Sequence, residues 1–295
     1  MAKLSYPIFG IDNLKANKSF NELLNADRFK DYLSKNPHLN AIHKHSFYHL
    51  LYFSKGSGTH IIDFENFPIH PGMIYFMRPG QVHNWKFETE VDGFIINFSP
   101  DFFDLQSINS NFIDQLHFFA GTLDQQVISL NKEIQIKVQH ILEEIIQEQK
   151  QKQAGAQFVI AALLIQLFLT INRTFPETPI LKKTTNYNVL IFKNFKQLIE
   201  DNFYVLKLPK DYAALLYITP KHLNALSKDY AGISAGEMIR NRVILEAKRL
   251  LINFDLTIKE IALELDFPDT SYFVKFFKKH TKLTPESFRN EQNNL

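Results

Sequence analysis

The sequence contains no cysteine among its 295 residues. This absence excludes disulfide bonds, thiolate catalysis, cysteine-ligated zinc and iron–sulfur clusters, and it fits a reducing compartment. Any metal ion bound by this protein would have to be held by imidazole.

Long apolar runs are missing as well. No stretch of about 18 uninterrupted apolar residues suggests a membrane span. Residues 1–7 also lack the charged start and the apolar stretch of a signal peptide. We therefore expect a cytoplasmic protein with no membrane partner.

The chain has little net charge, since 33 basic residues oppose 31 acidic ones and leave +2. Dividing the sequence after Asn186 gives 17 basic and 18 acidic residues before the cut, and 16 and 13 after it, hence −1 and +3. Histidine is concentrated in the first part, at positions 38, 43, 45, 49, 60, 70 and 83. The length and the ordinary share of apolar residues, 45%, predict two folded domains.

Residues 41–100 show short strands separated by turns. Runs rich in Ile, Phe, Tyr and Val end at glycine or proline, which favour tight turns. One predicted strand, Thr59–Phe64, ends at a turn formed by Glu65 and Asn66. Many short strands at this spacing predict a β-sandwich or small barrel.

Helical periodicity follows the strands. Apolar residues recur three or four positions apart over residues 131–151, and a more uniformly apolar helix is expected over 158–171. This helix pair could cover the barrel or form a dimer seam. Because residues 175–187 contain two prolines and no periodicity, we predict a linker there between domains at 1–174 and 188–295.

The C-terminal part contains one pattern twice. Each copy has a short helix, a turn and a second helix, over residues 209–230 and again over 257–280. Thr219 caps the second helix of the first copy, and Thr257 caps the first helix of the second copy. A longer helix over 234–251 joins them, and we expect its Arg240, Arg242, Lys248 and Arg249 to point outward. Two short helices joined by a tight turn form a helix-turn-helix, whose second helix enters the DNA major groove.

The exposed face of each second helix carries residues that suit DNA contacts. Asn pairs with adenine, Lys reaches guanine or phosphate, and Ser or Thr bonds either kind of group. We expect sequence-specifying contacts from Lys221, Asn224, Thr270, Ser271 and Lys275. Phosphate contacts are expected from Lys228, Lys278 and one of Arg240 and Arg242.

The C-terminal part contains Leu256–Ala262, Phe267, Ser271–Phe273, Phe276–Lys279, Thr284–Pro285 and Arg289. Together these residues resemble the signature of the AraC/XylS family of bacterial transcription regulators. The segment Glu246–Leu251 is similar to the segment that links the two helix-turn-helix units in that family. Asp266 and Lys282 stand where the family usually has glycine, and Ala225 where relatives often carry a longer side chain. The resemblance implies a tandem helix-turn-helix domain that binds double-stranded DNA.

The N-terminal histidines resemble the two motifs of the cupin barrel, the usual sensory domain of this family. His43, His45, His49 and His83 are the matching positions, with His49 where metal-binding cupins have glutamate. Because that carboxylate is missing, we expect these histidines to line a small-molecule pocket, with neither a metal nor another cofactor. His60 and His70 are expected at the surface.

Two hypotheses follow. The first is a ligand-responsive transcription regulator with a cupin-like sensory barrel followed by helices and an all-α tandem helix-turn-helix domain. It is not an enzyme; its partners are DNA, a small-molecule effector, a second copy in a homodimer and, as a further candidate, RNA polymerase. The alternative is a cupin metalloenzyme, an oxygenase or isomerase that uses the histidine cluster.

Overall fold

The computed structural model describes residues 8–11, 14, 23–99, 101–108, 110–120, 123–175, 186–253 and 255–293. These residues form two compact units, one within 8–175 and the other within 186–293. The predicted linker lies mostly outside the described residues, because only 175, 186 and 187 of its positions are described. The predicted order of a sheet-rich domain and a helical domain is confirmed.

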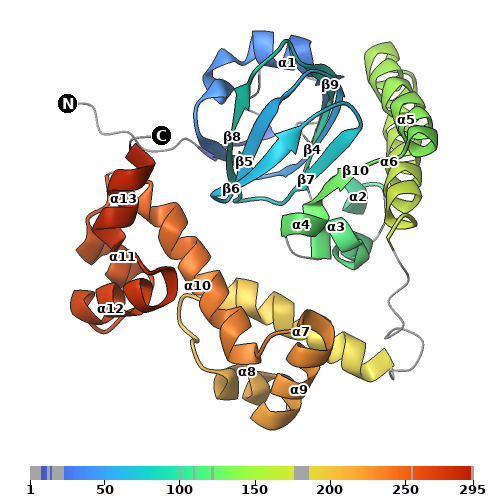
Figure 1. Ribbon diagram of the computed structural model, residues 1–295. Helices are drawn as coiled ribbons and strands as arrows, with labels where there is room; N and C mark the ends of the chain where they lie inside the picture. The colour runs from blue at the N-terminus through green and yellow to red at the C-terminus, as the bar shows by residue number, and fades with distance from the viewer. Residues whose placement is uncertain are drawn as a thin grey trace. The chain divides into compact units, whose positions relative to one another are not determined.

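The N-terminal unit contains two five-stranded sheets (Figure 1). In spatial order, the first sheet consists of β1 (Ile8–Phe9), β3 (His43–His45), β8 (Val82–Phe87), β5 (Gly58–Ile62) and β6 (Glu65–Ile69). The second consists of β10 (Val127–Ser129), β7 (Met73–Met77), β4 (Tyr48–Lys55), β9 (Asp92–Phe98) and β2 (Leu24–Arg28). All pairs are antiparallel except β1 with β3.

The second sheet is buried on both faces. Successive side chains of a strand point to opposite faces, so Leu51 and Phe53 of β4 pack between the sheets, together with Trp85 of β8. Leu50 and Tyr52 belong instead to the core that forms against the helices. Two buried faces explain why β4 and β7 are apolar almost throughout.

Two long helices, α5 (Lys132–Gln151) and α6 (Ala156–Asn172), lie side by side and cover the outer face of the second sheet (Figure 1). The amide of Gln149 on α5 donates to the Ala26 carbonyl and accepts from the Ala26 N–H, both at 2.8 Å. Of the two arrangements left open by the sequence, the structure therefore shows the pair covering the sheet. The short helices of this unit are α1 (Phe29–Lys35), α2 (Asp101–Asp104), α3 (His117–Ala120) and α4 (Leu123–Gln126), with 3₁₀ turns at Pro37–Asn40 and Ser110–Gln115.

The hairpin between β5 and β6 corrects one prediction. The turn lies at Asp63 and Phe64, with φ of 46° and 74°, and Glu65 already pairs with Ile62. Two successive positive φ values give the two-residue turn that matches strand twist, usually with Asn or Gly. The predicted strand therefore ended two residues too late, because Asp-Phe is not a typical sequence for this turn.

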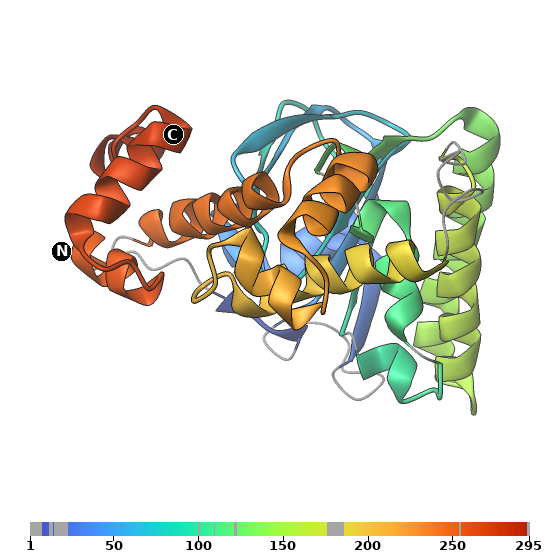
Figure 2. The same ribbon diagram turned by 90° about the horizontal axis from the view of Figure 1, so that it is seen from below.

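The C-terminal unit is helical. Its helices are α7 (Asn186–Asn202), α8 (Pro209–Leu215), α9 (Pro220–Ala231), α10 (Ala235–Leu251), α11 (Ile258–Glu264), α12 (Thr270–Thr281) and α13 (Pro285–Asn293). Helix α10 runs from the α8–α9 pair to the α11–α12 pair (Figure 1, Figure 2). Among the helices that the structure describes in both units, none combines the length and apolar character needed to cross a membrane.

The two helix pairs have matching lengths: α8 and α11 have seven residues each, and α9 and α12 have twelve. The predicted caps are present, since Thr219 accepts from the His222 N–H and Thr257 forms a capping box with Glu260. Gly232 and Lys282 end α9 and α12 at equivalent positions, with φ of 72° and 69°. Lys282 thus adopts the left-handed conformation that suits glycine, at a steric cost of about 1–2 kcal/mol.

Candidate DNA-binding helices and the buried histidine cluster

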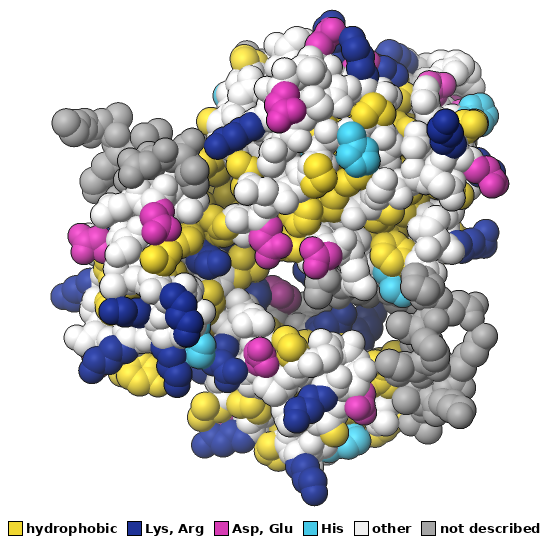
Figure 3. Space-filling view, viewed as in Figure 1, with side chains coloured by type: hydrophobic (Ala, Val, Ile, Leu, Met, Phe, Trp, Pro, Cys, Tyr) yellow, Lys and Arg dark blue, Asp and Glu magenta, His cyan; other side chains and the backbone are white. Residues whose placement is uncertain are grey.

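Helices α9 and α12 each bury one face and expose the other. Leu223 and Leu226 of α9, and Phe273 and Phe277 of α12, are at most 3% exposed and hold the helices against the unit's core. Most of the predicted contact residues are exposed on the opposite faces: Lys221, Lys228, Ser271, Lys275 and Lys278. Thr270 and Asn224 are partly exposed. Lysine and arginine side chains are frequent over the C-terminal helices (Figure 3).

Asn224 has a structural contact that the sequence did not reveal. Its side-chain oxygen accepts a hydrogen bond of 3.2 Å from the Ala235 N–H, in the first turn of α10. An adenine contact through the same oxygen would compete with this bond. Asn224 therefore couples α9 to the start of α10.

Two arginines of α10 have little solvent exposure, contrary to the expectation that they point outward. The Arg242 side chain is 15% exposed and that of Arg249 is 8% exposed, and both approach Glu246. Arg242 also donates to Glu200 of α7 at 2.7 Å, and its guanidinium lies 3.8 Å from the centre of the Phe203 ring. Because Arg242 is already paired, Arg240, which is half-exposed, is the remaining candidate for a phosphate contact.

Arg289, part of the family signature, also has an internal role. Its guanidinium donates to the carbonyls of Leu251 and Leu256, at 2.9 and 2.7 Å. These bonds satisfy carbonyls at the end of α10 and in the following loop, which lack helical partners. Arg289 therefore fixes the connection between α10 and α11.

Five histidines are buried between the sheets of the N-terminal unit. His43 and His45 lie on β3, His83 on β8, His49 on β4 and His60 on β5, and each is at most 2% exposed. Four of these were predicted to line one cavity, and the structure brings them together. His60 corrects a prediction, because it is fully buried rather than at the surface, whereas His70 is exposed.

The position of His60 follows from strand parity. Gly58, His60 and Ile62 of β5 are buried, whereas Thr59 and Ile61 are half-exposed. The adjacent Ile61 and Ile62 made the inward face ambiguous in the sequence. Placing the turn after Ile62 would have identified Ile62 and His60 as inward residues.

Hydrogen bonds fix the outer nitrogens of three of these rings. His43 Nδ1 contacts the Ala41 carbonyl at 2.7 Å, and His49 Nδ1 contacts Asn97 Oδ1 at 2.8 Å. Both acceptors are oxygens, so each Nδ1 carries the proton and each Nε2 retains a lone pair. His83 Nδ1 lies 3.0 Å from His60 Nε2.

Four ring nitrogens in the cluster have no hydrogen-bond partner among the described residues: His45 Nδ1, His49 Nε2, His60 Nδ1 and His83 Nε2. A buried polar atom without a partner is costly and requires an explanation, such as a bound ion or molecule. The cluster is therefore incomplete as a hydrogen-bonded core.

Burial makes these imidazoles neutral near pH 7. It lowers the pKa of His43 to about 4 and that of His49 to about 3. The pKa values of His45, His60 and His83 are also lowered by burial and, next, by their histidine neighbours. A neutral imidazole can accept a hydrogen bond or ligate a metal.

Comparison with protein-family models assigns both units. A helix-turn-helix domain matches residues 212–291, and an AraC-like ligand binding domain matches residues 35–168. The first match begins within α8 and covers the rest of both helix pairs, and the second covers every histidine of the buried cluster.

Individual relatives extend over both units. The uncharacterized HTH-type transcriptional regulator YfiF of Bacillus subtilis (strain 168) is 27% identical over 85% of this chain and 80% of its own length. The HTH-type transcriptional activator RhaR of Mannheimia succiniciproducens is 20% identical over 84% of this chain and 86% of its length. Among solved structures, ToxT from Vibrio cholerae aligns with a TM-score of 0.42 and 15% identity, over 92% of this chain and 98% of that one.

Proposed function

Because this chain belongs to the AraC family of transcription regulators, we propose that α9 and α12 read two successive major-groove segments of one DNA site. The supporting observation is the geometric repetition of the helix pairs. Helices α8 and α11 have equal lengths, and α9 and α12 share their length, a side-chain N-cap and a left-handed C-terminal residue. Helix-turn-helix units that read the same face of B-DNA bind about 34–36 Å apart, one helical turn.

Within this function, exposed side chains near the start of each helix specify the sequence. These are Lys221 on α9 and Thr270, Ser271 and Lys275 on α12, with Asn224 contributing through its amide nitrogen. Lys228, Lys278 and Arg240 hold phosphates. This division follows from the groove geometry, in which the N-terminal part of a recognition helix contacts the bases.

The N-terminal unit senses an effector, and we propose that the protein acts as a homodimer in the cytoplasm. Helix α6 supports dimerisation, because Phe158 and Leu169 are 55% and 41% exposed and recur with Ala162 and Ile165 at helical spacing on one side. RNA polymerase is a further proposed partner. The alternative of a metalloenzyme loses support, since the relatives named above are regulators.

Replacement of Lys275 by alanine tests the base-reading role. We expect operator affinity to fall by about 1–3 kcal/mol, with relaxed preference at one base position, because a lysine bonded to a base edge discriminates among bases. The measurement is selection of binding sites from random DNA, followed by titration of the selected site.

Two matched variants complete this test. Lys278→Ala removes a phosphate contact, so it should weaken binding to all DNA sequences alike. The number of counterions released on binding, measured by the slope of log affinity against log salt, should fall by about one. Lys137→Ala removes the same charge from an exposed position on α5 of the other unit and should change neither quantity. Unchanged affinity and preference in Lys275→Ala would refute the assigned role.

A further inference from the structure

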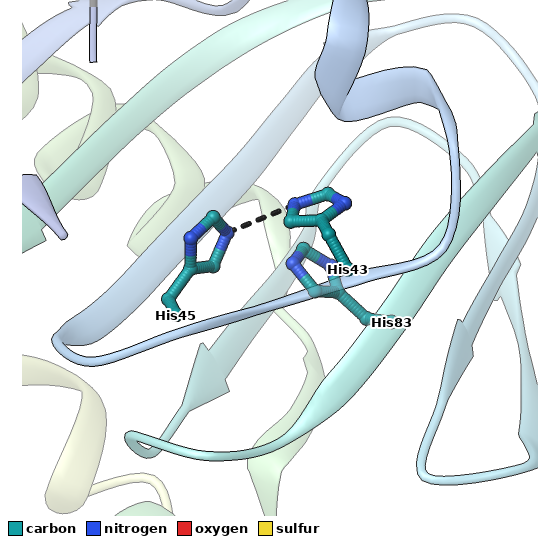
Figure 4. Close-up of side chains that lie close together, drawn as sticks. All are labelled: His43, His45 and His83. Carbon is teal, nitrogen blue, oxygen red and sulfur yellow. Dashed lines mark hydrogen bonds between the residues drawn. The ribbon is translucent and has the colours of Figure 1, made fainter. Parts of the chain in front are cut away.

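The buried histidines are arranged as a metal site. Within the described residues, His43, His45 and His83 present ligand atoms that all lie within 4.8 Å of one another, and all three are buried (Figure 4). His43 Nε2 and His45 Nε2 are 3.0 Å apart. Two nitrogens bound to one tetrahedral zinc ion at about 2.0–2.1 Å lie about 3.3 Å apart, so this spacing is close to that of a shared ion.

Outer hydrogen bonds prepare two of these rings, those of His43 and His83, for ligation. The Ala41 carbonyl holds the proton of His43 on Nδ1 and leaves its Nε2 as an electron-pair donor. His60 Nε2 can accept from His83 Nδ1 in the same way, which directs the lone pair of His83 Nε2 inward. Metal-bound histidines characteristically have such outer partners, which set the tautomer and the ring orientation.

A fourth imidazole lies beside these three rings. The His49 ring lies 5.1 Å from the His45 ring and 5.2 Å from the His83 ring, measured between centroids. Its proton is held on Nδ1 by Asn97, and its Nε2 has no partner among the described residues. A bound ion would account for the unpartnered Nε2 atoms of His49 and His83.

We propose that the N-terminal unit binds one late divalent transition metal ion, of the Zn²⁺, Ni²⁺ or Cu²⁺ class, through His43, His45 and His83. His49 supplies the fourth ligand, and His60 is a positioning residue that acts through His83. Neutral imidazoles suit these ions, whereas Mg²⁺ and Ca²⁺ prefer oxygen ligands, which this set lacks. The proposal concerns the N-terminal unit alone and does not depend on how the helices read DNA.

The test uses the full chain, stripped of metal by a chelator and titrated with Co²⁺, whose visible absorption reports tetrahedral nitrogen coordination. We expect one ion per chain. His45→Gln should abolish this absorption, whereas His70→Gln, on the exposed turn after β6, should leave it unchanged. Saturation only at metal excess with no intense band, or a full band in His45→Gln, would overturn the proposal.

His60 has its own test. His60→Phe removes the acceptor for His83 Nδ1–H and should weaken binding about 10- to 100-fold. His60→Gln offers a side-chain oxygen in its place and should restore much of the affinity. Equal affinities for wild type and both variants would remove His60 from the site.

A spectroscopic measurement keeps the proposal testable if His45→Gln fails to fold. X-ray absorption of the zinc-loaded wild-type protein should show three or four imidazole nitrogens at about 2.0–2.1 Å. A shell composed mainly of oxygen would show adventitious surface binding and contradict the site. Binding to a defined DNA site is measured separately in the metal-free protein, so failure of one proposal is distinguishable from failure of the other.

Discussion

Acidification of the metal-free protein from pH 6.5 to pH 4 is expected to remove on the order of 5 kcal/mol from the stability of the N-terminal unit. In the unfolded chain a histidine takes up a proton near pH 6.5. In the folded chain burial lowers the pKa of His43 to about 4 and that of His49 to about 3. Below pH 6.5 the unfolded state therefore binds protons that the folded state excludes.

The direction and the pH window follow from this difference. Above pH 6.5 both states are neutral at these rings, and stability does not depend on pH through them. Each histidine then contributes a loss of about 1.4 kcal/mol per pH unit until the pH reaches its folded pKa. Because carboxylates add their own effect at lower pH, the interval from pH 6.5 to 5 isolates the histidines.

The single tryptophan makes this measurement specific. Trp85 lies in the cluster, with its ring 5.0 Å from that of His83, so its fluorescence reports unfolding of the N-terminal unit. Urea titrations at several pH values give the slope. His49→Asn should make the slope shallower, whereas His140→Ala, exposed on α5, should leave it unaltered. A stability that stays constant from pH 6.5 to 5 would contradict the account of the cluster.

Glu246→Ala is expected to destabilise the C-terminal unit by about 3–5 kcal/mol, because it leaves two largely shielded guanidinium groups without their shared carboxylate. Glu246 accepts from Arg242 at 2.9 Å and lies 3.6 Å from Arg249. Its other oxygen accepts from the Tyr204 hydroxyl at 3.3 Å. The contact of Arg242 with Glu200 links this network to α7.

Calorimetry of the full chain measures this loss of stability. The relevant transition is the unfolding of the C-terminal unit, which Trp85 fluorescence does not report. Glu246→Gln keeps an acceptor but removes the charge, and we expect a smaller loss than for alanine. Glu264→Ala, exposed on α11, should change stability by less than about 0.5 kcal/mol. If Glu246→Ala and Glu264→Ala had similar effects, the network would not be a determinant of this unit's stability.

The tandem helix pairs were predictable because local chemistry specifies them. Thr219 and Thr257 cap helices directly, and Pro220 occupies a first helical position, so the boundaries depend on neighbouring residues alone. The end of α12 differs, because Lys282 adopts a left-handed conformation that its own side chain does not favour.

The mispredicted residues depend on tertiary partners. Arg242 and Arg249 were placed outward by their charge, but Glu246, one helical turn away, makes their burial favourable. The inward orientation of His60 depends on a turn at Asp63 and Phe64 that lacks the usual residues. The unpartnered nitrogens of the cluster could not be predicted from the sequence, because they depend on the pairing of β3 with β8 and on the packing of both strands against β4. Hydrophobic periodicity specifies neither of these contacts.

The most direct test of the central claim is hydroxyl-radical footprinting of the wild-type protein on DNA selected from random sequence. If α9 and α12 both bind one face of the DNA, two segments should be protected and should also be shared among the selected sequences. Their centres should lie about 10–10.5 base pairs apart. We expect Lys221→Ala to relax preference in one segment and Lys275→Ala in the other. A single conserved segment, or one affected alike by both variants, would contradict the proposal that α9 and α12 each read DNA.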